Sequence, residues 1–333
     1  MNSPLLDIGY RHWNGTVQNV WVRRAVVARH TMQACLRGRV IRFLVAVTWV
    51  LSLVTATAYF AVGQILVPEG LLRPLFELIM DDKARRFVEG ISAWLALYPD
   101  VTVRLVADLL LLHLNMILQT ISFLVVTLII PRLLTRDLAS NAIVVYSSRA
   151  ISRFDYLFGK LAGVLGVFSL CWLGPAILAW VLGNVVAPDW SFFWHSRSAL
   201  GYTLATAIPS MVVTALLAMA ISALSAKSRI AVAIWLMVWL LTPVFVPIAN
   251  MTSDWVAYLN FSHVLDRFAI AIFDPYRDFL LARESLPFFN TLFGRLKEST
   301  VQSFGYSPLA GPAIGLLIVS FLSLLILFRR TRS

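Results

Sequence analysis

The chain contains few charged residues, and acidic residues are the scarcer kind. Only 14% of its 333 residues are charged, with 17 Asp and Glu, whereas 59% are apolar. A soluble domain carries about 25% charged and about 45–50% apolar residues. Because this much apolar surface cannot be buried in one water-soluble core, the composition excludes a soluble enzyme. It predicts an integral membrane protein.

Cysteine is also scarce, and several catalytic motifs are missing. Cys35 and Cys171 are the only two cysteines, which excludes a disulfide framework or a cysteine-rich metal site. No Gly-x-x-x-x-Gly-Lys-Ser/Thr phosphate loop occurs, so this chain is not expected to hydrolyse ATP by that mechanism. The lack of a His-Glu-x-x-His motif and of aspartates paired in facing spans disfavours a membrane enzyme. We expect no catalytic residue, bound cofactor or metal in this chain.

Long apolar segments are abundant, and a membrane-spanning helix needs about 20 such residues. The first run ends at Pro68, and Pro131 with Arg132 is expected to end the second. The predicted fold is an all-α integral membrane protein with a six-span transmembrane domain at 43–328. The six predicted spans are residues 43–67, 109–130, 161–182, 199–224, 230–248 and 309–328.

The positive charges are distributed unequally between the two sides of these spans. If both termini are cytoplasmic, the inside segments hold 17 Lys and Arg against three Asp. Cytoplasmic loops of membrane proteins carry such an excess of Lys and Arg. The net charge of +11 therefore indicates orientation in a membrane, and no nucleic-acid partner is expected. The predicted inside segments are residues 1–42, 131–160, 225–229 and 329–333.

The N-terminal segment is expected to contain an amphipathic helix at 17–37. An apolar face and a basic face are separated at helical spacing, except that Arg24 falls on the apolar side. Such a helix is typical of the cytoplasmic membrane interface, where it lies against the lipid. A solvated helix packed on protein is the alternative. The apolar face is formed by Val17, Trp21, Ala28, Met32 and Cys35, and the basic face by Arg23, Arg29, His30, Gln33 and Arg37.

Two long segments are expected on the outer side. Residues 68–104 and 249–308 mix apolar and charged residues, which predicts amphipathic helices between spans 1 and 2 and between spans 5 and 6. The second segment is too charged to span a membrane, yet it is apolar enough to lie on the outer leaflet.

The largest inside loop, residues 131–160, combines an apolar patch with a basic rim. Asp137 is placed to cap or start a short helix, and residues 142–146 are apolar. Arg149, Arg153 and Lys160 follow. An exposed apolar patch of this kind is suited to docking a cytosolic partner. The pattern alone equally fits packing against the undersides of the spans.

The same loop contains four short motifs: Arg136-Asp137, Ser140-Asn141-Ala142, Ser148-Arg149-Ala150-Ile151-Ser152-Arg153 and Tyr156-Leu157-Phe158-Gly159-Lys160-Leu161. In these residues it resembles the loop between spans two and three of type 2 ABC transporter permeases. Ala150 stands where the family has proline, and Asn141-Ala142 stands where Gly-Thr is common. Weaker similarity lies in Tyr10-Arg11-His12-Trp13-Asn14-Gly15 and in the stretch 262–274 before the last span.

This resemblance implies the membrane subunit of a bacterial ABC exporter in the cytoplasmic (inner) membrane. Hydrolysis of ATP with Mg would take place on a separate cytosolic ATPase, present in two copies in the family's architecture. A second permease, the same chain or a similar one, would complete the complex. The segment 137–149 would be the coupling helix that sits in a cleft of the ATPase. A non-transport scaffold that docks an ATPase is the alternative. The implied ATPase-coupling residues are Asp137, Ile143, Val144, Tyr146, Ser148, Arg149 and Arg153.

Four polar residues share one face of the second predicted span at 100° per residue: Asp108, Asn115, Gln119 and Ser122. Polar groups inside a bilayer are costly, so one interpretation is that they line the transport path between two permeases. The other is ordinary hydrogen bonding between helices, which contributes about 0.6 kcal/mol on average.

Overall fold

The computed structural model describes residues 19–66, 97–140, 152–187, 189–241, 254–285, 302 and 305–332. Within these ranges the chain is helical and contains no strand, in agreement with the predicted all-α class. Five of the helices are long and apolar enough to cross a membrane. These candidate spans are Arg39–Gln64, Pro99–Ala139, Arg153–Val185, Ser191–Leu224 and Ala310–Arg330.

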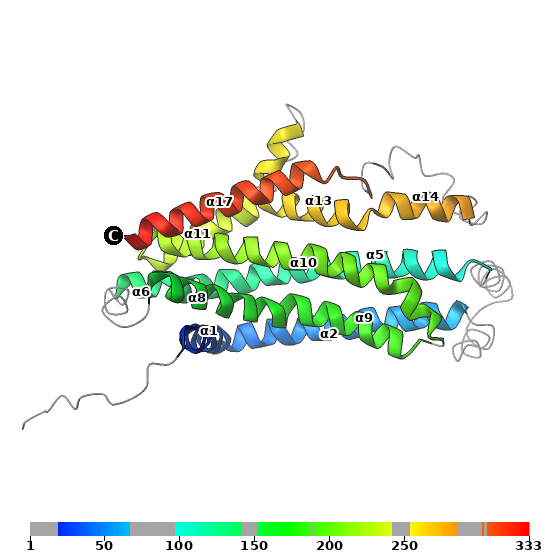
Figure 1. The fold of residues 1–333 in the computed structure, drawn as a ribbon, viewed down its shortest axis with the longest axis horizontal. Coiled ribbons are helices and arrows are strands. Elements are labelled where there is room, and N and C mark those ends of the chain that lie inside the picture. Colours follow the sequence, from blue (N-terminus) through cyan, green and yellow to red (C-terminus); the bar gives the residue numbers. More distant parts are fainter. Residues whose placement is uncertain are drawn as a thin grey trace, which may run out of the picture.

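Figure 1 shows the long helices running side by side along one axis. The first, fourth and last candidate spans are α2 (Arg39–Leu66), α10 (Ser191–Leu224) and α17 (Ala310–Arg332). Helix α1 (Val20–Leu36) is seen nearly end-on in this view, so its axis runs across the bundle. Such an orientation suits the predicted interfacial helix.

The second candidate span does not end at Pro131, contrary to the sequence prediction. Helix α5 (Pro99–Ile130) continues through a π-helical turn, η1 (Pro131–Thr135), into the short helix α6 (Arg136–Ala139). A proline removes a backbone donor and disturbs its preceding turn. Here the hydroxyl of Ser222 on α10 donates to the carbonyl of Ile130 and accepts from the backbone N–H groups of residues 134 and 135. A side chain from a neighbouring helix therefore satisfies the groups that the distortion releases.

The third candidate span has a similar interruption. It consists of α8 (Arg153–Phe168), a π-helical turn η2 (Ser169–Leu173) and α9 (Gly174–Val185). The carbonyls around this turn accept from α2: Trp49 Nε1 lies 2.9 Å from the oxygen of Leu170, and Ser52 Oγ lies 2.6 Å from that of Pro175. These bonds fasten the third span to the first.

The fifth predicted span, residues 230–248, has only partial structural support. Helix α11 (Ser228–Leu236) and the π-helical turn η3 (Met237–Leu241) form a short apolar helix. Residues 242–250, including Pro243 and Pro247, lie outside the described residues. A fifth span over 230–248 therefore stays a prediction.

The predicted outer segment 249–308 contains three described helices. A 3₁₀ turn, η4 (Asp254–Leu259), precedes α13 (Phe261–Phe273) and α14 (Pro275–Ser285). The Asn260 side chain caps α13, and Asp274 ends it in the left-handed conformation with φ 48°. Helix α13 packs against α10 and α17, and α14 packs against α5. Of the other outer segment, 68–104, residues up to 96 lie outside the described residues.

The bundle has two distinct ends in Figure 1. One end, which we call the loop end, carries α1, α6, the start of α8 and the C-terminal end of α17. The other, which we call the far end, carries the starts of α5 and α10 together with α14. Charged side chains form a cluster at each end, and these two clusters are the polar sites compared below.

Candidate functional site

The base of the 131–160 loop is held together by three side chains, which we call the loop-base cluster: Asp137, Tyr156 and Lys160. The Lys160 ammonium lies 2.8 Å from the Asp137 carboxylate and 2.9 Å from the carbonyl oxygen of Leu133, to which it donates. The Tyr156 hydroxyl donates to the same carboxylate. Asp137 lies within α6 but does not cap it, because its carboxylate binds α8 instead. The cluster therefore joins α6 to the first turns of α8.

A second ion pair joins α1 to the start of α8. Arg24 lies 2.6 Å from Asp155, and both Nε and Nη2 contact the same carboxylate oxygen. The other oxygen of Asp155 accepts from Ser152, whose hydroxyl also caps α8 by accepting from the Asp155 backbone N–H. This pairing explains why Arg24 falls on the apolar side of α1 in the sequence pattern.

Aromatic side chains cover this ion pair. The Arg24 guanidinium lies 4.7 Å from the ring centre of Trp21 and 5.1 Å from that of Phe158, within the range of cation–π attraction. Trp21 and Phe158 themselves meet edge to face. Trp21 was predicted on the apolar face of α1, and it is 63% exposed, as a membrane-interface side chain can be.

Helices α1 and α8 approach closely because α8 presents a glycine stripe, formed by Gly159, Gly163 and Gly166. A Cβ atom on Gly163 would lie 2.6 Å from the Cβ of Thr31 and 2.7 Å from the carbonyl oxygen of Ala28. A Cβ on Gly159 would lie 2.7 Å from that of Val27. No larger residue fits without moving α1. Small residues at such spacing allow helix backbones to pack directly.

Arg132 closes the other end of α1. Its guanidinium donates to the carbonyl oxygens of Ala34 and Cys35, at 3.2 and 3.0 Å, near the helix C-terminus. The last carbonyls of a helix have no partner within the helix, so this contact satisfies them. Burial raises the pKa of the Cys35 thiol to about 11, which keeps it protonated and unreactive.

A small cavity opens between α1 and the loop-base cluster. It has a volume of about 310 Å³, and cationic side chains dominate its wall. The lining residues are His30, Thr31, Ala34, Arg37, Arg132, Arg136, Asp137 and Lys160.

Most predicted coupling residues cannot be placed. Ile143, Val144, Tyr146, Ser148 and Arg149 lie outside the described residues. Asp137 joins the loop-base cluster, and Arg153 begins α8. Sequence reasoning missed the partners that organise the loop base. Two signals pointed to them: the misplaced charge of Arg24, and glycines recurring four and three residues apart on α8.

The four predicted path-lining residues are all buried within the chain. Asn115 accepts a 2.7 Å hydrogen bond from Trp172 Nε1, and Gln119 donates a 2.9 Å hydrogen bond to Asp266 on α13. Asp108 lies 3.8 Å from Arg104, and the Ser122 hydroxyl has no hydrogen-bond partner among the described residues. The contacts of Asn115 and Gln119 are those of helix-to-helix bridging. A path-lining role for these four residues stays a prediction.

The chain matches no model of a known protein family, and no curated protein is significantly similar to it. Among the described residues, no three His, Cys, Asp or Glu side chains come together as metal ligands would. The site is therefore interpreted from its own geometry. Within the described residues, that geometry consists of α6 and α8, the helices on either side of residues 141–151, which are joined to each other and to α1.

Proposed function

We propose that this chain is the membrane subunit of an ABC transporter, and that residues 137–149 dock a separate cytosolic ATPase. The observation that carries the proposal is the loop base. The loop whose sequence resembles a coupling helix joins two candidate spans, and Asp137 and Lys160 tie those spans together at 2.8 Å. The excess of Lys and Arg in the segments at this end supports a cytoplasmic position.

The contacts around the loop suggest how docking would affect the spans. A displacement of the loop would move α6 and α8 together, because the loop-base cluster joins them. It would also move α1, through Arg24 and the glycine stripe. From α6 the helix continues without a break to Pro99 at the far end. Packed cores transmit such displacements because they deform little.

The proposed complex contains further chains. A second permease, either the same chain or a similar one, would face this subunit in the bacterial inner membrane. Two ATPase copies would bind ATP and Mg and supply the hydrolysis, and the complex would export its substrate. The family resemblance of the loop supports these assignments.

A non-transport scaffold is the second candidate. The observation that favours it is the burial of Asp108, Asn115, Gln119 and Ser122, each no more than 3% exposed within this one chain. Such a scaffold would dock the same ATPase through the same loop. Substrate flux through the reconstituted complex distinguishes the two functions.

Co-purification with the ATPase tests the docking. Ile143→Asp and Tyr146→Asp place a charge in the apolar patch of the loop, and both should reduce recovery of the ATPase at least about tenfold, the effect of losing about 1.4 kcal/mol. Tyr98→Asp is the matched control, because Tyr98 is 40% exposed and precedes α5 at the far end. Equal recovery with all three variants would contradict the proposal.

A further inference from the structure

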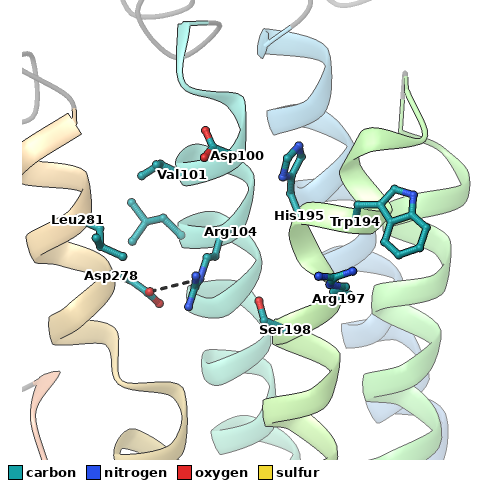
Figure 2. Close-up of a pocket in the computed structure, with 10 residues that line it drawn as sticks. Asp100, Val101, Arg104, Trp194, His195, Arg197, Ser198, Asp278 and Leu281 are labelled. Atoms are coloured by element: carbon teal, nitrogen blue, oxygen red, sulfur yellow. Dashed lines mark ion pairs between the residues drawn. The ribbon is translucent and has the colours of Figure 1, made fainter.

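A second cavity lies at the far end, between α5, α10 and α14. Its volume is about 430 Å³, within the range of about 300–1,000 Å³ that is typical of small-molecule sites. Figure 2 shows its side chains, with Asp278 and Arg104 pointing toward each other. The lining residues are Asp100, Val101, Arg104, Leu105, Trp194, His195, Arg197, Ser198, Asp278 and Leu281.

The charges at this cavity are incompletely paired. Arg104 Nε lies 3.7 Å from Asp278 and 3.8 Å from Asp108, both beyond the range of about 2.7–3.2 Å for a hydrogen bond. We call these three residues the Arg104 cluster. Asp278 is only 3% exposed; Arg277 Nη2 donates to its Oδ1 at 3.5 Å, whereas its Oδ2 accepts no hydrogen bond from a described basic or hydroxyl side chain. A buried carboxylate oxygen without a donor is unfavourable, so the cluster lacks a donor at this position.

The lining carries both signs of charge. Asp100 and Asp278 face the cavity together with Arg104 and Arg197. A simple anion would meet two carboxylates there, and a simple cation would meet two guanidinium groups. A ligand with both a phosphate and an ammonium group gives each lining charge an opposite partner. The ammonium would pair closely with Asp278, whose described cationic partners, Arg277 and Arg104, lie at 3.5 and 3.7 Å.

The surroundings of the cavity are those of a membrane interface. Trp190 and Trp194 are 64% and 54% exposed at the start of α10, and Trp194 lines the cavity. Tryptophan gathers at the headgroup level of bilayers, where its ring contacts lipid and its N–H contacts water. The Arg197 guanidinium lies 5.3 Å from the ring centre of Trp194, which places a cation at the same level.

We propose that the far-end cavity binds a phosphoethanolamine zwitterion. Arg197 and Arg104 receive its phosphate, and Asp278 receives its primary ammonium. The ligand is either the headgroup of phosphatidylethanolamine or a free phosphoethanolamine ester. This proposal does not depend on ATPase docking at the loop end.

Lipid binding to the purified full-length chain tests the site. Short-chain phosphatidylethanolamine should bind at least about tenfold more tightly than the corresponding phosphatidylcholine, whose quaternary ammonium offers no N–H donor to Asp278. It should also bind more tightly than phosphatidylglycerol, which has no cation. The readouts are lipid adducts in native mass spectrometry and the shift in unfolding temperature. Equal binding of the three lipids would overturn the proposal.

Variants distinguish this site from general lipid contact. Asp278→Asn should abolish the preference for phosphatidylethanolamine over phosphatidylcholine. Arg197→Gln, at an exposed position, should weaken binding of both lipids about fivefold. Arg229→Gln, at an exposed position in the first turn of α11 at the loop end, is the matched control and should change nothing. Binding unaffected by Asp278→Asn and by Arg197→Gln would contradict the assignment.

Soluble glycerophosphoethanolamine separates the two sources of the ligand. If it binds with the same dependence on Asp278 and Arg197, the site accepts a free ester. If only the lipid binds with that dependence, the site reads the bilayer headgroup. Either result supports a phosphoethanolamine site, whereas equal binding of inorganic phosphate would show an anion site and overturn it.

Discussion

The two ends of the bundle hold their charged residues in contrasting ways. At the loop end, Asp137 and Lys160 lie 2.8 Å apart and Arg24 and Asp155 lie 2.6 Å apart, with additional hydroxyl donors on both carboxylates. At the far end, Arg104 is 3.7 and 3.8 Å from the Asp278 and Asp108 carboxylates, and Arg277 Nη2 lies 3.5 Å from Asp278. The described charges at the loop end are paired closely with one another, whereas those at the far end are paired at longer distances.

The largest loss of stability is expected from a substitution in the glycine stripe at the loop end. Gly163→Leu would force a side chain into the backbone of α1 and should destabilise the protein by about 3 kcal/mol or more, as severe overpacking does. The unfolding temperature of the purified chain and protease access to α1 measure the effect. Gly201→Leu is the control, because nothing lies within 4 Å of a Cβ at that position. Similar destabilisation by both variants would show that close α1–α8 packing is not responsible.

The loop-base cluster should give the next largest effect. Asp137→Asn leaves the Lys160 ammonium, in a residue that is only 8% exposed, without its charge partner. We expect a loss of about 2 kcal/mol in unfolding free energy. A double-mutant cycle with Lys160→Met measures the coupling between the two side chains, which should be about 1–2 kcal/mol. Additive effects would mean that the pair contributes no coupling at the loop base.

Arg24→Gln should be milder, because the Arg24 side chain is 26% exposed and solvent screens its charge. The expected loss is about 1 kcal/mol. Arg29→Gln, on the exposed basic side of the same helix, is the matched control. If the two variants unfold at the same temperature, the Arg24–Asp155 pair does not hold α1 in place.

The smallest change in unfolding free energy should come from the Arg104 cluster. The sign of this change tests whether the two ends of the bundle differ. Asp108→Asn replaces a buried carboxyl group that lies against the Asp278 carboxyl with an amide of the same shape. We expect stability to change by less than about 0.5 kcal/mol, or to rise, because two buried carboxyl groups in contact disfavour each other's charged form and the substitution removes one of them. Chemical denaturation of the Asp108→Asn and Asp137→Asn variants under the same conditions compares their free energies of unfolding. A loss as large as that of Asp137→Asn would show that the far end is as tightly paired as the loop end.

Apolar runs were sufficient to locate the helices of five candidate spans, because the hydrophobic signal of a membrane helix extends over 20 residues. Helix ends were less predictable. Pro131 was expected to end a span. The helix continues instead, because the hydroxyl of Ser222, 91 positions further along the chain, forms hydrogen bonds with the backbone groups that the π-helical turn at Pro131 leaves without helical partners. That partner becomes visible only when α10 lies beside α5.

The candidate site was predictable only in outline. The loop motif pointed to residues 131–160, and Asp137 does lie at the loop base. Lys160 was predicted as part of the basic rim of the loop and not as the partner of Asp137, since the pairing depends on how α6 meets α8. The Arg104 cluster could not be foreseen, because Asp108 and Asp278 are separated by more than half of the chain.

Photo-crosslinking from the loop tests the central claim most directly. With p-benzoylphenylalanine in place of Tyr146, irradiation of native membranes should attach the chain to a protein that mass spectrometry identifies as a phosphate-loop ATPase. The same group in place of Tyr98, at the far end, should give no such product. If Tyr146 yields no ATPase crosslink, or Tyr98 yields one equally well, the loop is not the docking site.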